Sequence, residues 1–391
     1  MEYKKVAVIG GGASGIAAAI KAAEKGNRVT IYEHTDSLGK KLLITGNGKC
    51  NFSNRDAGIF HYHSSTDKGQ TAGVFSRFPF DETRLFLEKA GLYIREKEGR
   101  FYPYTDSSKT VLKVLKLELK SLGVEVLLNS HVSDLADDLC VGGRSFDRVI
   151  LATGGCSFKN TGSDGSGLEI LKKSGIRIIE PLPALTPLPL KEDVSDLKGV
   201  RCSARVTLFI DGKETASAKG ELQPYEKGLS GICAMDLSGQ AARALFEGKK
   251  AEAETDFFPE CSEEDLKRRL EEGLKAHPRR GLKDIAGGLF TEKLVNFLFH
   301  PIDTRKPDHL DSFVNRIKHC RFTVSDEILK DFRMAQATSG GVSFEEVNGE
   351  LELIKRPGIR LCGEILDIYG DCGGYNLQWA LSSGFMAGDI R

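Results

Sequence analysis

The sequence lacks the features that mark several classes of protein. Lysine and arginine together number 55, and so do aspartate and glutamate, which gives a formal net charge of zero. A chain without net charge has no general electrostatic attraction to nucleic acid or to an anionic membrane. No apolar run reaches the length of about 20 residues that spans a bilayer. We therefore expect a cytoplasmic protein with no membrane partner, and nucleic acid is disfavoured as a partner.

Patterns typical of disulfide frameworks and metal sites are also missing. None of the nine cysteines is spaced from another as C-x-x-C. An odd count in a long chain without a secretion signal argues against disulfides. The only close histidine pair is His61 and His63, and no further ligand stands at a usual spacing. We interpret this pair as part of a polar surface loop and predict no metal site.

A glycine-rich turn near the N-terminus has the pattern of a dinucleotide-binding unit. Residues 4–9, KKVAVI, read as a short buried strand, and GGGASG follows at residues 10–15. In the G-x-G-x-x-G pattern Gly10 permits the tight turn, Gly12 admits a pyrophosphate and Gly15 allows close packing of helix on strand. The small-residue helix that follows would offer free N–H groups and a positive dipole end to phosphates.

The next strand ends in the acidic residue that such a unit requires. Residues 28–32, RVTIY, form this strand, and Glu33 follows 23 residues after Gly10. A carboxylate at about this distance accepts hydrogen bonds from ribose hydroxyls. Strand, glycines, helix, strand and acid in register predict dinucleotide binding. A glycine turn with only a structural role would leave Glu33 unexplained.

Two later stretches distinguish FAD from NAD. Residues 147–155, DRVILATGG, read as a buried strand ending in A-T-G-G, which resembles the second signature of two-dinucleotide-fold flavoproteins. The preceding strand is expected at residues 123–132, with Val132 near the adenine. Residues 358–389 resemble the third FAD motif, in which a helix N-terminus points at the flavin C2 carbonyl. The positive end of that helix would stabilise negative charge on the reduced flavin.

Taken together, the motifs resemble one family. They are GGGASG, KKLLITGNGKCN, ATGG, TGSDGSG, ATSGGVSFEEV and GEILDIYGDCGGYNLQWALSSG, and they span essentially the whole chain. This set is similar to the HI0933-like (BaiN-like) family of FAD flavoproteins. The resemblance implies an α/β fold, with a Rossmann-like FAD-binding domain of the two-dinucleotide-fold (glutathione reductase-like) type and an insert. Relatives include amine (aminoacetone) oxidases and bile-acid-pathway reductases, so the family fixes the cofactor better than the substrate.

The resemblance and the nucleotide pattern give a set of cofactor-binding candidates. They are Gly10, Gly12, Ala13, Ser14, Gly15, Glu33, His34, Lys40, Lys41, Gly46, Asn47, Gly48, Asn51, Val132, Ala152, Thr153, Gly154, Gly155, Gly363, Glu364, Asp371, Gly374, Tyr375, Asn376 and Leu377. Gly340 and Gly341 are further candidates for contact with the flavin ring.

Several of these residues have a plain structural alternative. Asn51 could bond the flavin or stabilise its own loop as an Asx turn. Asn376 could act through its backbone N–H or cap the last helix. Cys50 and Cys372 could serve a redox role, but a small buried residue filling a tight turn explains each of them better. For residues 40–51 a loop cradling the cofactor is favoured over a surface loop, and a redox role for Cys50 ranks last.

The insert should begin after a cluster of prolines. Residues 203–210 alternate like a strand, and Asp211-Gly212 is a hairpin signal. From Ser262 the pattern becomes helical. We predict an FAD-binding domain in two parts, residues 1–190 and 334–391, a β-rich insert at 191–260 and a helical insert at 261–333. Residues 220–231 depart from the family pattern and could form a substrate-contacting loop or a surface loop.

The predicted function is that of an FAD-dependent oxidoreductase. Flavin carries out hydride transfer at N5 by itself, so no catalytic triad is required, and no catalytic residue is assigned. We expect a small organic substrate between flavin and insert, with NAD(P)H as a transient electron donor to be tested. Within this class, an amine oxidase and an NAD(P)H-dependent reductase of an unsaturated, steroid-like or bile-acid-like substrate remain open.

An alternative from another class is a flavin-containing RNA-binding or RNA-modifying protein, for which residues 275–283 supply a basic cluster. The sequence leaves the oligomeric state open.

Overall fold

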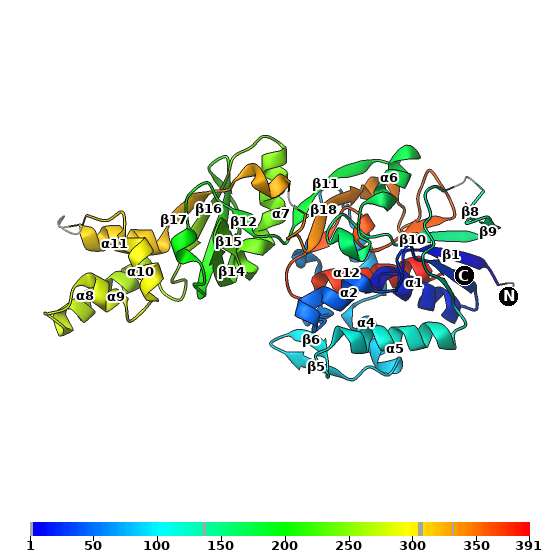
Figure 1. Ribbon diagram of the computed structural model, residues 1–391, viewed down its shortest axis with the longest axis horizontal. Coiled ribbons are helices and arrows are strands. Elements are labelled where there is room, and N and C mark those ends of the chain that lie inside the picture. Colours follow the sequence, from blue (N-terminus) through cyan, green and yellow to red (C-terminus); the bar gives the residue numbers. More distant parts are fainter. Residues whose placement is uncertain (1–2, 136–137, 304–307, 331) are drawn as a thin grey trace. The chain divides into compact units, whose positions relative to one another are not determined.

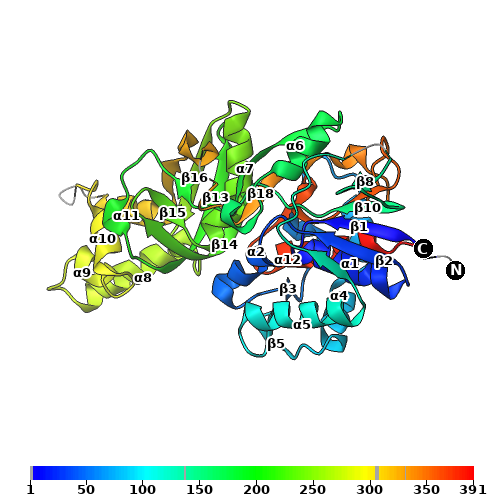
Figure 2. The ribbon, with the colours of Figure 1, turned by 45° about the vertical axis from the view of Figure 1, so that its right-hand side comes forward.

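The computed structural model describes residues 3–135, 138–303, 308–330 and 332–391 (Figures 1 and 2). The chain divides into two compact units. The first combines Met1–Leu182 with Phe332–Arg391, and the second is Pro183–Asp331. The predicted division into four parts, residues 1–190, 191–260, 261–333 and 334–391, is finer than these two units and stays a prediction.

A five-stranded parallel sheet forms the centre of the first unit. Its strand order is β19-β10-β1-β2-β7, and every neighbouring pair is parallel. The strands are β1 (Lys5–Ile9), β2 (Arg28–Tyr32), β7 (Glu125–Leu127), β10 (Arg148–Leu151) and β19 (Ile359–Leu361). The apolar runs of β1, β2 and β10 are buried after their first residue, as expected for parallel strands covered on both faces. The α/β Rossmann-like fold class is therefore confirmed.

Two helices from opposite ends of the chain pack together beside this sheet (Figure 1). They are α1 (Ala13–Glu24) and α12 (Tyr375–Gly388). Both are rich in small residues on the facing sides. A Cβ on Gly384 would lie 2.5 Å from the carbonyl oxygen of Ser14, and one on Gly388 would lie 2.3 Å from that of Ala18. The C-terminal helix is thereby held against the start of the nucleotide-binding unit.

Smaller elements complete the first unit. Its other helices are α2 (Lys40–Ile44), α3 (Gln70–Arg77), α4 (Phe80–Lys89), α5 (Ser108–Ser121) and α6 (Ser166–Lys173). A three-stranded sheet contains β3 (Ser53–Asn54), β6 (Arg100–Pro103) and β5 (Ile94–Lys97). Three two-stranded pairs are formed by β4 (Tyr62–His63) with β20 (Tyr369–Gly370), β8 (Cys140–Val141) with β9 (Arg144–Ser145), and β11 (Ile178–Ala184) with β18 (Ala337–Val342). Strand β18 lies within residues 334–391, the predicted second part of the FAD-binding domain.

The second unit is built on a six-stranded antiparallel sheet. Its order is β12 (Leu188–Pro189), β15 (Gly228–Ser230), β14 (Lys213–Tyr225), β13 (Cys202–Ile210), β16 (Ala251–Asp256) and β17 (Cys320–Thr323). Helix α7 (Ile232–Phe246) packs on β13 and β14. The remaining helices are α8 (Glu263–Ala276), α9 (Leu282–Ala286), α10 (Glu292–Phe299) and α11 (His309–Lys318), which lie close together in Figures 1 and 2.

Local signals in this unit have their expected structures. Asp211 and Gly212 have φ of 51° and 78° and join β13 to β14, as the hairpin signal predicted. The hydroxyl of Ser262 accepts a hydrogen bond from the N–H of Asp265 at 3.1 Å and caps α8. Residues 220–231 are not a loop. They form the end of β14 and all of β15, with Tyr225 paired to Gly228.

Two strands differ from the sequence reading. The strand expected at residues 123–132 is only Glu125–Leu127. It ends because Asn129 adopts a left-handed φ of 52° and its N–H bonds the carbonyl of Thr35, which turns the chain toward the end of β2. Residues 320–323, counted with the helical insert in the sequence reading, form β17, because they pair with β16 across a long stretch of chain.

Candidate active site

The turn between β1 and α1 leaves the start of the helix open. Gly10 has φ of +103°, and a Cβ there would lie 2.4 Å from the carbonyl oxygen of Ala152. A Cβ on Gly15 would lie 1.9 Å from the carbonyl oxygen of Gly10, so helix and strand approach too closely for a side chain. A Cβ on Gly12 would meet no atom within 4 Å. Since the first turn of α1 has no side-chain cap and no acidic residue, its N–H groups are available to an anion.

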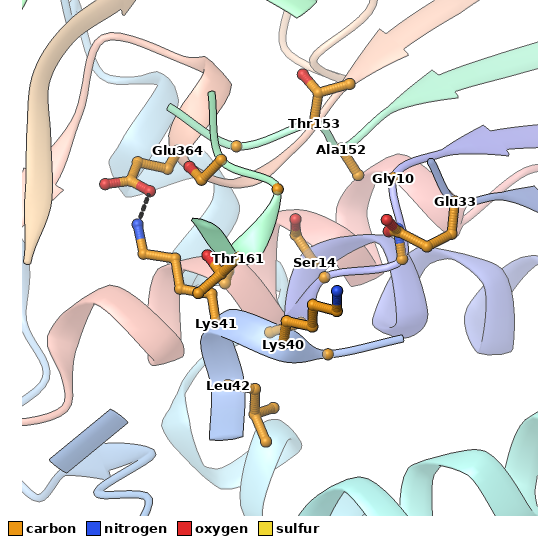
Figure 3. A pocket seen from close by; sticks show the side chains of 18 of the residues that line it. Gly10, Ser14, Glu33, Lys40, Lys41, Leu42, Ala152, Thr153, Thr161 and Glu364 are labelled. Atoms are coloured by element: carbon orange, nitrogen blue, oxygen red, sulfur yellow. Dashed lines mark hydrogen bonds and ion pairs between the residues drawn. The ribbon is translucent and has the colours of Figure 1, made fainter. Parts of the chain in front are cut away.

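Glu33 lies at the end of β2 and is 6% exposed. Its Oε2 accepts a hydrogen bond from the N–H of Gly11 at 2.7 Å, and its Oε1 accepts one from the N–H of Thr35 at 2.7 Å. A carboxylate can accept about four hydrogen bonds, so capacity for ribose hydroxyls remains. Figure 3 shows Glu33 beside the Gly10 turn. The acid therefore also fastens the glycine turn, a role that sequence spacing did not indicate.

A pocket in the first unit gathers residues from the start, middle and end of the chain (Figure 3). It brings together most of the predicted cofactor residues. Those that line it are Gly10, Gly12, Ala13, Ser14, Glu33, His34, Lys40, Lys41, Val132, Ala152, Thr153, Gly154, Glu364, Asn376 and Leu377. Their contact with a cofactor stays a prediction, but their convergence on one cavity supports it.

An ion pair crosses the wall of this pocket. Lys41 Nζ lies 2.5 Å from Glu364 Oε2, the contact drawn dashed in Figure 3, and donates a hydrogen bond to Ser157 Oγ at 2.7 Å. The other carboxylate oxygen of Glu364 accepts a hydrogen bond from the N–H of Thr338 at 2.7 Å. Lys40 instead pairs with Asp36 at 2.7 Å. Both lysines therefore line the pocket with a carboxylate partner of their own.

The other predicted residues lie outside the pocket lining. They are Gly15, Gly46, Asn47, Gly48, Asn51, Gly155, Gly363, Asp371, Gly374 and Tyr375, together with the ring candidates Gly340 and Gly341. Gly46 and Asn47 take left-handed φ values of 56° and 54° in the turn Thr45–Gly48. Asn51 Oδ1 is buried without a hydrogen-bond partner among the described residues. A role for these residues at the cofactor stays a prediction.

The close histidine pair is placed differently from the sequence interpretation. His61 and His63 are partly buried rather than part of a freely exposed loop, and both contact Asp371, which is more than 300 residues away in the chain. Sequence spacing could not show this carboxylate. Among the described residues, no group of three or more histidine, cysteine or acidic side chains could hold a metal ion.

Sequence reasoning also missed part of the pocket wall. Thr161, Gly162 and Ser163 line it, as do Ser130, His131, Gln336 and Trp379. The glycine-rich TGSDGSG stretch was the available signal for the first group, because Gly162 has φ of +98° and a Cβ there would lie 2.9 Å from the ring of His34. No local pattern marked Gln336 or Trp379, which reach the pocket through the tertiary fold.

The pocket has the chemistry of a dinucleotide site. Thr153 and Ser163 line it, and their hydroxyl oxygens are buried without a hydrogen-bond partner among the described residues. The open start of α1 beside Gly12 fits a diphosphate and the Glu33 carboxylate fits a ribose, so the lining fits a dinucleotide. Fold and pocket thus define a dinucleotide-binding protein of the Rossmann class.

Comparison with known proteins identifies the family. The model of the HI0933-like protein Rossmann domain matches residues 4–390. The 3-dehydro-bile acid delta(4,6)-reductase of Clostridium scindens is 34% identical, with 98% of each chain covered. Ribosomal RNA dihydrouridine synthases of Haemophilus influenzae and Escherichia coli are each 26% identical. The matches cover 98% of this chain and 97% and 96% of theirs.

The chain belongs to the HI0933-like family, and the resemblance seen in its sequence is confirmed. It is an FAD-dependent oxidoreductase, and the predicted cofactor, FAD, is confirmed with the family. No helix among the described residues is long and apolar enough to cross a membrane.

Proposed function

We propose that this protein uses FAD to reduce a carbon–carbon double bond conjugated to a carbonyl group in a small organic molecule, with NAD(P)H as the electron donor. The observation that carries the proposal is the 34% identity, over 98% of both chains, to a relative named as a reductase of 3-dehydro-bile acids. The names of the other relatives point the same way, because dihydrouridine is uridine with one ring double bond saturated.

The residues of the pocket would hold the cofactor in three places. The glycine turn and the first N–H groups of α1 would bind the diphosphate, and Glu33 would bind the adenosine ribose. At the other end, α12 begins after Gly374 with no side-chain cap and no acidic residue in its first turn. Its positive end would stabilise negative charge on the reduced ring. When bound, FAD supplies hydride transfer at N5.

Anaerobic absorption spectroscopy of the purified FAD-bound protein tests the proposal. NADH or NADPH should bleach the flavin absorption, and a conjugated enone such as a 3-keto-4-ene steroid should restore it. The matched saturated ketone is the control and should restore nothing. Bleaching by primary amines without nicotinamide would instead identify an amine oxidase. Failure of both nicotinamides to reduce the flavin would overturn the proposed electron donor.

A second candidate substrate is ribosomal RNA, because two relatives are named as ribosomal RNA dihydrouridine synthases. The predicted basic cluster fits it. Lys275, His277, Arg279, Arg280 and Lys283 are all exposed, at the end of α8 and in the loop and helix that follow. A uridine ring also contains a double bond conjugated to a carbonyl, so the chemistry at the flavin would be the same.

Binding of a transcribed ribosomal RNA fragment at several salt concentrations separates the two substrates. If RNA is the substrate, the double variant Arg279→Gln/Arg280→Gln should weaken binding and flatten its salt dependence. The matched variant Lys249→Gln/Lys250→Gln removes two exposed charges from the same unit and should weaken binding less. RNA binding unaffected by Arg279→Gln/Arg280→Gln would count against the cluster as an RNA site.

A further inference from the structure

Two histidines and an aspartate form a cluster that the proposed reaction has not yet used. His61 ends the short helix Ile59–His61, His63 lies in β4, and Asp371 follows β20. His61 Nδ1 lies 3.0 Å from Asp371 Oδ2, and His63 Nε2 lies 2.6 Å from Asp371 Oδ1. Each carboxylate oxygen therefore holds one imidazole. Backbone pairing fixes the arrangement, because the N–H of Asp371 bonds the carbonyl of His61 at 2.9 Å and β4 pairs with β20.

The cluster adjoins the pocket wall at the start of α12. Asn376 and Ile368 both line the pocket. The Asn376 side chain donates to the carbonyl of Gly370 at 2.8 Å and accepts from its N–H at 2.8 Å, which clamps the residue directly before Asp371. Tyr375, the first residue of α12, stacks on the ring of His61 with centroids 4.3 Å apart. The cluster is thus packed against the first turn of α12, the same turn that is proposed to face the flavin ring.

Acidic and aromatic side chains surround the two imidazoles, which are the groups of interest near neutral pH. Besides Asp371, Asp56 faces them, and its Oδ2 lies 3.4 Å from His61 Nε2. The aromatic neighbours are Tyr375 and Tyr369, and the Tyr369 ring centroid lies 4.9 Å from that of His63. Burial, followed by a hydrogen bond to Asp56, raises the pKa of Tyr375, so its phenol stays neutral. Histidine is the side chain whose charge changes in this pH range.

Access to water is open at the same place. The side chains of His61 and His63 are 32% and 25% exposed, and that of Asp371 is 21% exposed. Protons can therefore reach the imidazoles from solvent without passing through the pocket.

We propose that the His61–Asp371–His63 cluster takes up a proton from water when the bound cofactor is reduced and releases it when the substrate is reduced. The inference rests on the proposed placement of the flavin ring at α12. Two electrons and one proton arrive as hydride, which adds one negative charge beside the first turn of α12. An imidazole nitrogen then forms an N–H bond to a proton from water, and the added charge is balanced.

The return step balances in the same terms. Hydride leaves for one carbon of the double bond, the imidazolium N–H bond breaks, and one proton returns to solvent. The other carbon takes a proton from the medium, so each turnover consumes one nicotinamide hydride and one proton. The coupling is reciprocal: the negative charge of the reduced cofactor favours protonation of the cluster, and a protonated cluster favours reduction of the cofactor by the same free energy. The cluster thus acts on the reaction through charge, and His61, His63 and Asp371 are positioning residues.

Proton uptake during reduction tests the proposal directly. The FAD-bound protein is reduced anaerobically by a pre-reduced dye or by dithionite in weakly buffered solution near pH 7, with a pH indicator present. The wild type should take up more protons per FAD than His61→Gln/His63→Gln, with a difference approaching one. The control His319→Gln removes a histidine that pairs with Glu254 in the second unit and should match the wild type. Equal uptake by the double variant and the wild type would overturn the proposal.

Histidine NMR of the unmutated protein provides a measurement that does not depend on the variants folding. Two imidazole C2–H signals, assigned with the single variants His61→Gln and His63→Gln, should titrate at higher pH in the reduced protein than in the oxidised one. The signal of His319 should not move. Identical titrations of the two signals in both states would overturn the coupling. Because no substrate is used, a wrong substrate class would leave both experiments unaffected.

Discussion

Substitution of Glu33 should directly weaken binding of the cofactor. Its carboxylate holds the N–H groups of Gly11 and Thr35, each at 2.7 Å. In Glu33→Gln the amide nitrogen would face one of these donors, and the charge-assisted bonds would be lost. Hydrogen bonds to a charged group contribute about 1.5–3 kcal/mol, so the FAD dissociation constant should rise roughly ten- to hundredfold.

Equilibrium binding of FAD to the apoprotein, followed by flavin fluorescence, measures this change. Glu24→Gln is the matched control, since Glu24 is the last residue of α1, at the opposite end from the glycine turn, and pairs with Lys21. An unchanged dissociation constant in Glu33→Gln would contradict the role of this residue in the site.

Cys50 is a second residue with a definite expectation. Burial raises the pKa of its thiol to about 12, and burial likewise raises the pKa of Cys362 to about 12. The thiolate is the reactive form, so at pH 8 iodoacetamide should leave both residues unmodified in the native protein. Mass spectrometry of tryptic peptides measures the labelling, and the urea-unfolded chain, in which both should react, is the control. Rapid labelling of Cys50 in the native protein would instead favour a redox role for this residue, the least favoured hypothesis for residues 40–51 in the sequence analysis.

Among the elements, the contact between α1 and α12 should tolerate little added volume. Gly384→Ala would place a Cβ 2.5 Å from the carbonyl oxygen of Ser14, and neither backbone can move freely. Overpacking of this kind costs about 1–3 kcal/mol, which exceeds the gain in helix propensity of roughly 1 kcal/mol. The free energy of unfolding should therefore fall.

Gly73→Ala in α3 is the matched control for this substitution. A Cβ on Gly73 would meet no atom within 4 Å, so only the propensity gain remains and stability should rise. Urea unfolding of the two variants measures both effects. A stabilised Gly384→Ala protein would show that the two helices can move apart at little cost.

For the whole molecule, acid should loosen the first unit in part through Asp389. This residue follows α12 and pairs with Lys25 at 2.7 Å and Arg77 at 2.8 Å, which ties the ends of α12, α1 and α3 together. Burial alone would raise its pKa, but the two cations outweigh burial and lower it. Between the lower folded pKa and the unfolded value near 3.9, the unfolded chain binds more protons. This contribution to stability is present above about pH 4 and is lost as the pH falls through the folded pKa.

Asp389→Asn should therefore destabilise the first unit at pH 7, and the difference from the wild type should shrink as the pH falls below 4. The chain has a single tryptophan, Trp379, which is buried in α12, so its fluorescence reports the unfolding of the first unit. Asp193→Asn, in the second unit, is the control and should leave the Trp379 transition unchanged. A constant difference between Asp389→Asn and the wild type across pH would exclude the linkage.

At this scale the sequence and the fold contribute different information. Residues 4–33 could be interpreted from the sequence because strand, glycine turn, helix, strand and acid follow one another directly, and each conformation depends on near neighbours. The same holds for the Asp211-Gly212 hairpin and for the Ser262 cap of α8. Short-range sterics and hydrogen bonds determine these features, so they can be predicted from a single sequence.

Only the tertiary structure decided which distant side chains meet. Lys41 and Glu364 are 323 residues apart, and His61 and Asp371 are 310 apart, and both contacts exist because β19 and α12 return the chain to the N-terminal unit. No local pattern encodes that return, since it depends on burial of whole strands and helices against one another. The sequence by itself therefore determined the nucleotide-binding unit, the family and the cofactor, and the fold decided the ion pair on the pocket wall and the histidine cluster beside α12.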